Sequence, residues 1–495
     1  MHALTAHRGA AVAMVALALV GVPISLLAAT HRLDVGMRRR CGMLGARARR
    51  EDPMQMPAVK LTKRLLWLGL ALWASPLLAA APSLLLTHAT VIDGTGAPAR
   101  SGMSIAIRDG RIEAVYPDDS QPTPKGAKVD DLRGRYVIPG LIDAHVHLTG
   151  AETDLTHYRA LLHALLLGGV TSIRDMAGDD RLLGYLAWQA NSDTMASPDI
   201  FYVALMAGPT FFAQDIRAQE AAAGMPHGHA PWMQPITADT DIPLAVAEAK
   251  GTGATGLKLY ANLPAKLVAA ITAEAHRQGL RVWTHATIFP ARPSDAVDAG
   301  VDTISHSPYL VWEAAAQVPD DYRVRAKGDF THVAPDAPSI LAVFKAMKQH
   351  DTILDATLQA FEEEAQHHPE KVGAGIMRWS YAVTRLAHQQ GVRIDVGTDS
   401  AGLPSNAKGP DLSALPGVHE EMALLVEHAG FSPIEAIQAA TQVGAAALGQ
   451  GDQRGTISAG KRADLVVLTA DPARDIHNTT KIAFVIKNGV VYRKK

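Results

Sequence analysis

The chain has 495 residues, 48% of them hydrophobic and 19% charged, and a formal net charge of −2. So large an apolar share can fill a sizeable core, which excludes a globally disordered chain. The near-neutral balance lacks the basic footprint of nucleic-acid-binding proteins, so we expect no nucleic-acid partner.

The first predicted element is a secretory signal peptide at residues 60–81. It combines a basic start, an apolar stretch rich in leucine and a run of alanines, which is the usual order of charge, apolar helix and cleavage site. The prediction is an exported protein, periplasmic or secreted, whose mature chain begins near Ala81 or Pro82. The only cysteine, Cys41, precedes that point, so the mature chain has no disulfide and must bind any metal through nitrogen and oxygen.

A second apolar run precedes the signal peptide, from about residue 9 to residue 30. One explanation is that translation begins at Met54 or Met56 and that residues 1–53 are an over-extended start. The other is a membrane anchor, because about 20 apolar residues can span a bilayer. We favour the over-extended start, since the signal peptide is complete without this run. Residues 1–81 are thus assigned to an N-terminal extension, and membrane contact is expected only if that segment remains uncleaved.

Short apolar strands separated by glycine and aspartate turns follow the signal peptide and return at the end of the chain. Residues 84–140 have this pattern, and so do residues 455–495. We expect the two ends, residues 82–138 and 454–495, to pair into one small β-sandwich domain.

Between these ends, residues 139–453 alternate strands with helices rich in alanine and leucine. Eight strand–helix units predict an α/β fold, a (β/α)8 barrel of the TIM type, in which functional residues sit at the carboxyl ends of the strands. Two longer stretches, residues 206–241 and 311–337, interrupt the alternation, and insertions at that end often form substrate lids. The predicted barrel strands are residues 141–147, 170–175, 200–204, 256–260, 282–286, 303–306, 353–357 and 393–398.

The first candidate metal ligands are His145 and His147, in the sequence VIPGLIDAHVHL. Alternate residues of a strand point to the same side, so both imidazoles can face the barrel axis and share a cation. This motif alone does not exclude two histidines that merely end a core strand.

Four further candidates end later strands: Lys258, His285, His306 and Asp399. A lysine in an apolar strand is costly to bury as a free cation. Reaction with carbon dioxide would turn it into an anionic carbamate that bridges two metals. An ion pair with Asp399 or a surface position is the alternative. Asp399 could also only start a turn, and His306 could be an ordinary core histidine, but the joint order of the candidates is harder to explain by chance than any single one.

Together these segments resemble the amidohydrolase superfamily, in particular its binuclear members related to imidazolonepropionase and to the prolidase-like, metal-dependent Xaa-Pro dipeptidases. The resemblance covers nearly the whole mature chain, and the motifs that carry it include VIDGTG, PGLIDAHVHL, GVTSIRDMAG, GTDSAG and GTISAGKRADLVVL. It implies two divalent metal ions, with Zn²⁺ as the expected ion. By the resemblance, the more buried ion is bound by His145, His147 and Asp399. The second is bound by His285 and His306, and carboxylated Lys258 bridges the two.

The resemblance also implies a hydrolytic mechanism. A hydroxide that bridges two cations is a nucleophile at neutral pH, because metal binding lowers the pKa of water. Asp399 would take its proton and pass it to the leaving group. Tyr260 and Tyr309 follow two ligand strands and could donate to the oxyanion, although packing at the rim explains each tyrosine at least equally well.

The predicted reaction is hydrolysis of a C–N amide or peptide bond in a small molecule, a dipeptide or an N-acyl amino acid. Deaminases of the superfamily typically place a glutamate three residues after the histidine of strand five, and this chain has Ile288 there. A lactonase or phosphotriesterase-like hydrolase with the same metal site stays an alternative. So does a catalytically inactive barrel that serves as a binding module. A homo-oligomer is compatible with the sequence.

Side chains for substrate contact are less well defined. In the insertion after strand three, the residues that could line an apolar pocket are Phe211, Phe212 and Trp232. The same insertion contains His227 and His229, which more often belong to a mobile loop without a catalytic role. The candidate cations for a substrate carboxylate are Arg217, Arg292 and Arg323.

Overall fold

The computed structural model describes residues 84–494, except residues 124–125, 150–153, 193–194, 223, 227, 371 and 407–408. The signal peptide, the earlier apolar run and Cys41 lie outside these residues, so what the sequence indicates about them stays a prediction. Within the described part, no helix is both long enough and apolar enough to cross a membrane.

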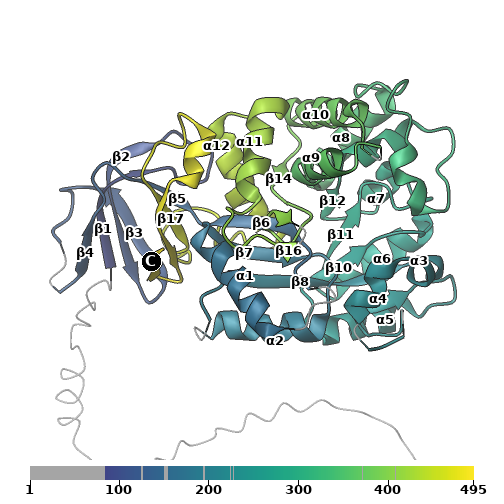
Figure 1. The fold of residues 1–495 in the computed structure, drawn as a ribbon, viewed down its shortest axis with the longest axis horizontal. Coiled ribbons are helices and arrows are strands. Elements are labelled where there is room, and N and C mark those ends of the chain that lie inside the picture. Colours follow the sequence, from purple (N-terminus) through teal and green to yellow (C-terminus); the bar gives the residue numbers. More distant parts are fainter. Residues whose placement is uncertain are drawn as a thin grey trace, which may run out of the picture. The chain divides into compact units, whose positions relative to one another are not determined.

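Eight parallel strands form a barrel, and they stand in the sheet in the same order as in the chain (Figure 1). They are β6 (Leu141–Val146), β7 (Val170–Asp175), β8 (Asp199–Ala207), β10 (Gly256–Leu259), β11 (Arg281–His285), β12 (Thr303–Ser305), β13 (Ile353–Asp355) and β14 (Ile394–Asp395). Every residue of β6, β7 and β10 is buried, as expected for parallel strands that are covered on both faces. Each predicted barrel strand overlaps one of the eight, and the prediction of a TIM-type barrel is confirmed.

The ring closes between the last strand and the first. The backbone amides of Ala144 and His147 donate to the carbonyls of Val396 and Ser400 over 2.8 and 2.7 Å. The chain leaves β14 directly toward Asp399 and then forms a small hairpin of β15 (Ser405–Asn406) and β16 (Gly409–Pro410). Closure therefore brings the candidate ligands of the first and last strands together at the carboxyl end of the barrel.

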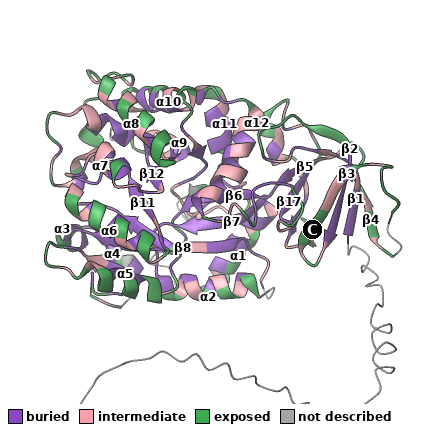
Figure 2. Ribbon diagram, turned by 180° about the vertical axis from the view of Figure 1, so that it is seen from behind, coloured by how far each residue is buried: buried purple, intermediate pink, exposed green. Residues whose placement is uncertain are grey.

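Helices cover the outside of the barrel and turn their exposed faces outward (Figure 2). In α6 (Ala265–Arg277), Val268, Ile271 and Ala275 recur at helical spacing and are buried. The side chain of Asp154 caps α1 (Leu155–Leu167), because it accepts from the second helical amide. The other helices around the barrel are α2 (Asp180–Asn191), α5 (Ile242–Gly251), α7 (Pro293–Asp298), α8 (Pro338–His350), α9 (Leu358–His367), α10 (Ala374–Gln389), α11 (Val418–Ala429), α12 (Pro433–Gln438), the π-helix η3 (Ala439–Val443) and α13 (Gly444–Ala447).

Both long insertions contain short elements of their own. The first holds α3 (Pro209–Gln214), α4 (Ile216–Ala222) and β9 (Met233–Pro235), and the second holds the 3₁₀-helices η1 (Ser307–Ala314) and η2 (Tyr322–Lys327). The two insertions touch, since the rings of Phe211 and Tyr322 lie 5.3 Å apart and the Tyr322 hydroxyl donates to Asp215.

Strands from both ends of the described chain form one sheet beside the barrel (Figure 1). Its order is β19–β18–β17–β5–β1–β2–β3, with β4 paired to β1. The central strand β5 pairs with β1 on one side and with β17 on the other, so the predicted pairing of the two ends is confirmed. The strands are β1 (Leu84–Val91), β2 (Arg100–Arg108), β3 (Arg111–Pro117), β4 (Lys128–Asp131), β5 (Tyr136–Pro139), β17 (Leu465–Leu468), β18 (Ile482–Lys487) and β19 (Val490–Tyr492), and the 3₁₀-helix η4 (Ile476–Thr480) precedes β18.

A cluster of buried charges joins this sheet to the barrel, and we call it the Asp199 cluster. Asp199, the first residue of β8, forms ion pairs with Arg454, Arg462 and Lys487 over 2.9, 3.2 and 2.6 Å. Burial raises the pKa of Asp199, but the three cations outweigh it and hold that pKa below its ordinary value. The carboxylate is therefore ionised and compensated within the protein.

Candidate metal centre

All six predicted ligands lie at the carboxyl end of the barrel. Parallel strands that close into a ring point their carboxyl ends to one mouth, so residues far apart in the chain converge there. The six are His145 in β6, His147 one residue beyond it, Lys258 in β10, His285 at the end of β11, His306 directly after β12, and Asp399 four residues after β14.

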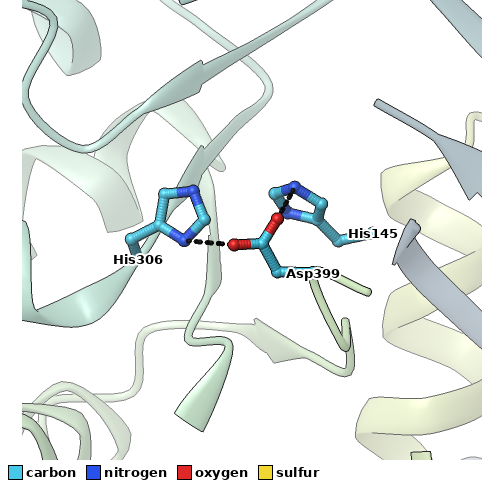
Figure 3. Close-up of side chains that lie close together, drawn as sticks. All are labelled: His145, His306 and Asp399. Atoms are coloured by element: carbon cyan, nitrogen blue, oxygen red, sulfur yellow. Dashed lines mark ion pairs between the residues drawn. The ribbon is translucent and has the colours of Figure 1, made fainter. Parts of the chain in front are cut away.

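Three of these residues form a compact cluster around one carboxylate (Figure 3). The side chain of Asp399 lies between two imidazoles. Its Oδ1 is 3.1 Å from Nε2 of His145, and its Oδ2 is 3.7 Å from Nδ1 of His306. One ligand atom from each residue lies within 4.8 Å of the others, which is the spacing that a single cation can bridge.

His147 lies on the solvent-exposed side of this cluster. Its Nε2 lies 3.0 Å from Oδ1 of Asp399, and its ring centre lies 5.3 Å from that of His145. The imidazole is 40% exposed, whereas that of His145 is fully buried. The two histidines of the His-x-His motif thus reach the same carboxylate oxygen from the interior and from the mouth.

His285 stands beside His306, with 4.5 Å between the two ring centres. It is buried, and its Nδ1 has no hydrogen-bond partner. Burial, followed by the nearby charges of His306 and Lys258, holds the pKa of His285 well below its ordinary value. The imidazole is therefore neutral, which is the form that binds metals.

Lys258 is completely buried, and its Nζ has no hydrogen-bond partner. Burial lowers the pKa of its amine to about 7, although the carboxylates of Asp355 and Asp399 work in the opposite direction. No ion pair joins Lys258 to Asp399 in the part of the chain that the structure describes, and the side chain does not reach the surface. The structure therefore shows neither a surface position nor an ion pair for this lysine among the described residues.

Asp355, the last residue of β13, belongs to the centre but was not identified from the sequence. Its Oδ2 accepts a hydrogen bond from Nδ1 of His145 over 2.6 Å. Burial raises the pKa of Asp355, but His145 and Arg174 outweigh it and keep the carboxyl ionised. This bond directs the other ring nitrogen of His145, Nε2, toward Asp399. An acidic residue at the end of a buried strand was the only signal that the sequence offered.

A second buried aspartate lies next to Asp355 and behaves differently. Burial and the charge of Asp355 raise the pKa of Asp395 well above its ordinary value, and neither of its side-chain oxygens has a hydrogen-bond partner. The positive charge of Arg174 acts on Asp395 in the opposite direction, but does not outweigh burial. The Arg174 guanidinium stacks 4.3 Å from the centre of the Trp283 ring and donates to the carbonyl of Ala144. Asp395 is therefore neutral, and Asp355 carries the negative charge at the base of the centre.

The donor set fits divalent metal ions. Among the described residues, two of the predicted ligands carry a buried nitrogen that finds no hydrogen bond, Nζ of Lys258 and Nδ1 of His285, and Nε2 of His145 faces the carboxylate of Asp399. Unsatisfied buried polar atoms are rare in proteins, and their convergence at one mouth indicates a ligand that the side chains are arranged to bind. Imidazole nitrogen and carboxylate oxygen are suited to Zn²⁺ and similar divalent ions.

The two tyrosines predicted at the rim both touch the histidines. The ring of Tyr260 lies 4.1 Å from that of His285, and the ring of Tyr309 lies 5.3 Å from that of His306. Tyr309 also accepts a hydrogen bond at its hydroxyl oxygen from Nε of Arg325 over 3.1 Å. Both aromatic rings therefore border the centre.

A pocket of about 370 Å³ opens onto the cluster at His147, Asp399 and Tyr260. Of the three aromatic residues predicted to line a pocket, Phe211 does so and Phe212 packs against it. Trp232 instead lines a separate hollow together with His229, and the predicted His227 lies outside the described residues. The apolar wall of the pocket consists of Met176, Ala177, Leu205, Phe211, Ala218, Ala221 and Met233.

Two of the three predicted cationic residues, Arg292 and Arg323, make contacts away from the centre. Arg323 forms a two-pronged pair with Asp321 at the surface, and Arg292 donates to the backbone carbonyls of Trp312, Glu313 and Ala316. The side chain of Arg217 is outside the described part. Arg325, which was not singled out from the sequence, is the arginine that contacts Tyr309 at the rim.

Comparison with known proteins gives concordant matches. Residues 136–492 match the model of the amidohydrolase family. An imidazolonepropionase from Symbiobacterium thermophilum is 27% identical over 393 residues, which cover 74% of this chain and 84% of that enzyme. The fold is similar to that of a Xaa-Pro dipeptidase solved with bound methionine in the active site, with a TM-score of 0.64, 23% identity and coverage of 83% of this chain and 100% of that one. A putative prolidase from Bifidobacterium longum gives a TM-score of 0.61 at 27% identity, with 84% and 96% covered.

Proposed function

The chain belongs to the amidohydrolase family, and from this premise we propose that it hydrolyses the amide or peptide bond of a small substrate, a dipeptide or an N-acyl amino acid. The observation that carries the proposal is the convergence of four imidazoles, a buried lysine and Asp399 on one mouth beside an apolar pocket. Such a centre supplies the parts of a hydrolytic site: ligands for cations, a base and a place for the substrate.

Two divalent cations, Zn²⁺ as the favoured ion, are part of this proposal. His145, His147 and Asp399 would hold one of them. His285 and His306 would hold the other, with Lys258, carboxylated by carbon dioxide, between the two. Nζ of Lys258 and Nδ1 of His285, which are buried without a hydrogen-bond partner, support this assignment, since each would gain a bonding partner. Bound divalent cations lower the pKa of water and polarise a carbonyl, which makes hydrolysis feasible at neutral pH.

Asp399 is the proposed general base and then the general acid. Burial raises its pKa, but His145 and His306 outweigh burial and hold it well below the ordinary value, so the carboxylate is ready to accept a proton. Its side chain is 27% exposed and lines the pocket, which places it within reach of the attacking water and of the leaving nitrogen. The proton that Asp399 takes from water is the one that it returns to the amine.

Tyr260 and Tyr309 are proposed to hold the scissile carbonyl oxygen. Both rings touch the histidines, and the Tyr309 hydroxyl is held by Arg325, so its position is set before substrate binds. Donors that are already oriented stabilise the developing oxyanion without reorganisation.

Amide hydrolysis is favoured over deamination by the residue three positions after His285. A buried isoleucine, Ile288, stands there, and its side chain cannot carry a proton. The putative prolidase among the similar structures supports a peptide-like substrate.

The test is a hydrolysis screen of the purified chain supplied with Zn²⁺ and bicarbonate. The panel holds dipeptides, N-acyl amino acids, aryl amides, lactones and phosphotriesters, and Asp399→Asn is the control. Cleavage of amides that disappears in the control supports the proposal. Activity confined to lactones or phosphotriesters would overturn the substrate class, and a chain that neither binds metal nor hydrolyses any compound would favour the inactive binding module.

We also propose that the chain is exported and that its mature form begins near residue 82. The motivation is the signal-peptide pattern at residues 60–81. Intact-mass measurement of the protein recovered from the periplasm or medium tests this, and a mature form that begins at Met1 would contradict it in favour of the anchor.

A further inference from the structure

The 3₁₀-helix η2 brings an arginine to the rim of the metal centre. Arg325 is half-buried in the insertion after β12. Its Nε donates to the hydroxyl oxygen of Tyr309 over 3.1 Å, and its guanidinium carbon lies 4.9 Å from the centre of the Tyr322 ring. One phenol bonds the guanidinium and a second ring supports its face, so the group is held in place.

This guanidinium stands one side chain away from the candidate ligands. The ring of Tyr309, which it contacts, lies 5.3 Å from that of His306 and 5.8 Å from that of His285. If the carbonyl of a substrate is bound at the histidines, a small substituent next to that carbonyl could therefore reach the guanidinium of Arg325.

The apolar pocket reaches the same histidines through Tyr260. That tyrosine lines the pocket, and its ring lies 4.1 Å from His285 and 5.6 Å from Tyr322. The site thus offers an apolar recess and a cation, both bordering the residues that would hold the scissile bond. A molecule that carries an apolar group and a carboxylate on either side of an amide matches this layout.

Neighbouring arginines are used differently. Arg323, two residues earlier, is exposed and pairs with Asp321 through Nε and Nη2, while Arg292 donates to backbone carbonyls. In a 3₁₀-helix successive residues turn by about 120°, so a shift of two positions sends the two side chains to different faces. The fold itself therefore distinguishes Arg325 from Arg323.

We propose that Arg325 binds the carboxylate of the substrate and makes the enzyme selective for amides that carry a free carboxylate, such as the C-terminal residue of a dipeptide or the amino acid of an N-acyl amino acid. The planar guanidinium matches a carboxylate in shape and charge. This inference rests on the proposed function, because it names the substrate class of the same site.

The first experiment compares N-acetyl-leucine with N-acetyl-leucinamide as substrates of the metal-loaded full chain, its Arg325→Gln and Arg325→Lys variants, and Arg323→Gln as the matched control. Arg325→Gln is expected to raise the KM for N-acetyl-leucine about 10- to 100-fold, since hydrogen bonds to charged groups contribute that much, with a smaller change in kcat. For cleavage of the acetyl amide bond of N-acetyl-leucinamide, the KM should stay near the wild-type value, and any fall in kcat caused by the loosened Tyr309 should be shared by both substrates. Arg325→Lys should recover part of the loss, and Arg323→Gln should behave as the wild type. An equal rise in KM for both substrates, or no rise for N-acetyl-leucine, would overturn the inference.

A binding measurement separates this inference from the proposed hydrolysis. Calorimetric titration of the Asp399→Asn chain with the same two compounds reports affinity without turnover. A preference of about tenfold or more for the carboxylate over the carboxamide, lost when Arg325→Gln is added, supports the carboxylate site even if the wild type cleaves neither compound. Equal affinities for the two compounds, or binding of neither compound, would overturn the carboxylate site. If the chain hydrolyses amides but binds the two compounds equally, the proposed function stands and only the selectivity is contradicted.

Discussion

Asp199 and Lys258 are both buried, charged residues of the barrel, but they lie at opposite ends of neighbouring strands. Asp199 begins β8 and is surrounded by Arg454, Arg462 and Lys487, at distances of 2.6 to 3.2 Å. Lys258 lies near the carboxyl end of β10, and its amine has no hydrogen-bond partner. One end of the barrel therefore compensates its buried charge within the protein, and the other end does not.

This difference separates a structural cluster from a site that binds a ligand. A buried charge whose partners come from the protein stabilises one arrangement of its segments, because loss of one partner leaves the others uncompensated. The buried amine of Lys258 and Nδ1 of His285 lack a hydrogen-bond partner, which costs free energy in the protein alone, and a bound group can recover that cost. The Asp199 cluster is of the first kind and joins the sheet domain to the barrel. Lys258 and His285 are of the second kind and lie at the carboxyl end of the barrel.

The largest expected effect is on activity, in Lys258→Met. Activity should fall by about three orders of magnitude or more, because the proposed metals would supply several kcal/mol of transition-state stabilisation and would depend on the proposed bridge. Metal content, measured by elemental analysis, should fall with it, and a short carboxylic acid should restore part of both. Metal-free Lys258→Met should be at least as stable as the metal-free wild type.

Lys487→Met is the matched control: it should lower the free energy of unfolding and keep the metal. Full activity in Lys258→Met would contradict the bridging role.

Asp199→Asn tests the other cluster. The variant leaves buried Lys487 with a neutral partner and Arg454 and Arg462 with the carboxylate of Asp464 alone. Its free energy of unfolding should fall by about 3–5 kcal/mol, as for other buried ion pairs that lose one member. Chemical denaturation measures this loss. Metal content and kcat of the folded protein should stay near those of the wild type, and a selective loss of metal without loss of stability would contradict the distinction between the clusters.

Asp355→Asn should weaken metal binding by about 10- to 100-fold, because outer-sphere partners of histidine ligands typically contribute that much. The amide cannot replace the charge that orients His145. Competition with a chelator of known affinity measures the change. Asp395→Asn is the control, since that carboxyl is already neutral and an amide has the same shape. Equal loss of affinity in both variants would argue against a specific role for Asp355.

The smallest effect concerns acid pH. The pKa of Asp199 is lower in the folded chain than in the unfolded chain, so the folded state binds fewer protons in that range. The stabilisation by the cluster is present above the ordinary pKa of aspartate and is lost as the pH falls through the lower, folded value. The difference in Tm between wild type and Asp199→Asn should therefore narrow below about pH 4. A constant difference down to the acid unfolding of both proteins would show that the charge of Asp199 is not what stabilises the junction.

Much of this protein is determined by local patterns in its sequence. Alternating strands and helices predicted the barrel, because parallel strands that are covered on both faces must be apolar along their length. The His-x-His spacing predicted that His145 and His147 share a side, because the strand repeats every two residues. Lys258 stood out in the sequence because it lies within an apolar strand, where a free cation is rarely buried.

Contacts between distant segments were decided only by the tertiary structure. Asp355 is 210 residues from His145, and its strand has no spacing motif that points to the histidine. Arg325 and Arg323 look equivalent in the sequence, and only the packing of η2 against Tyr309 decides which one reaches the centre. Trp232 was expected in the pocket, but the path of β9 turns it to a separate hollow. The physical reason is common to all three: strand and helix periods fix the face on which a side chain lies, but closure of the barrel and docking of its insertions determine what that face meets.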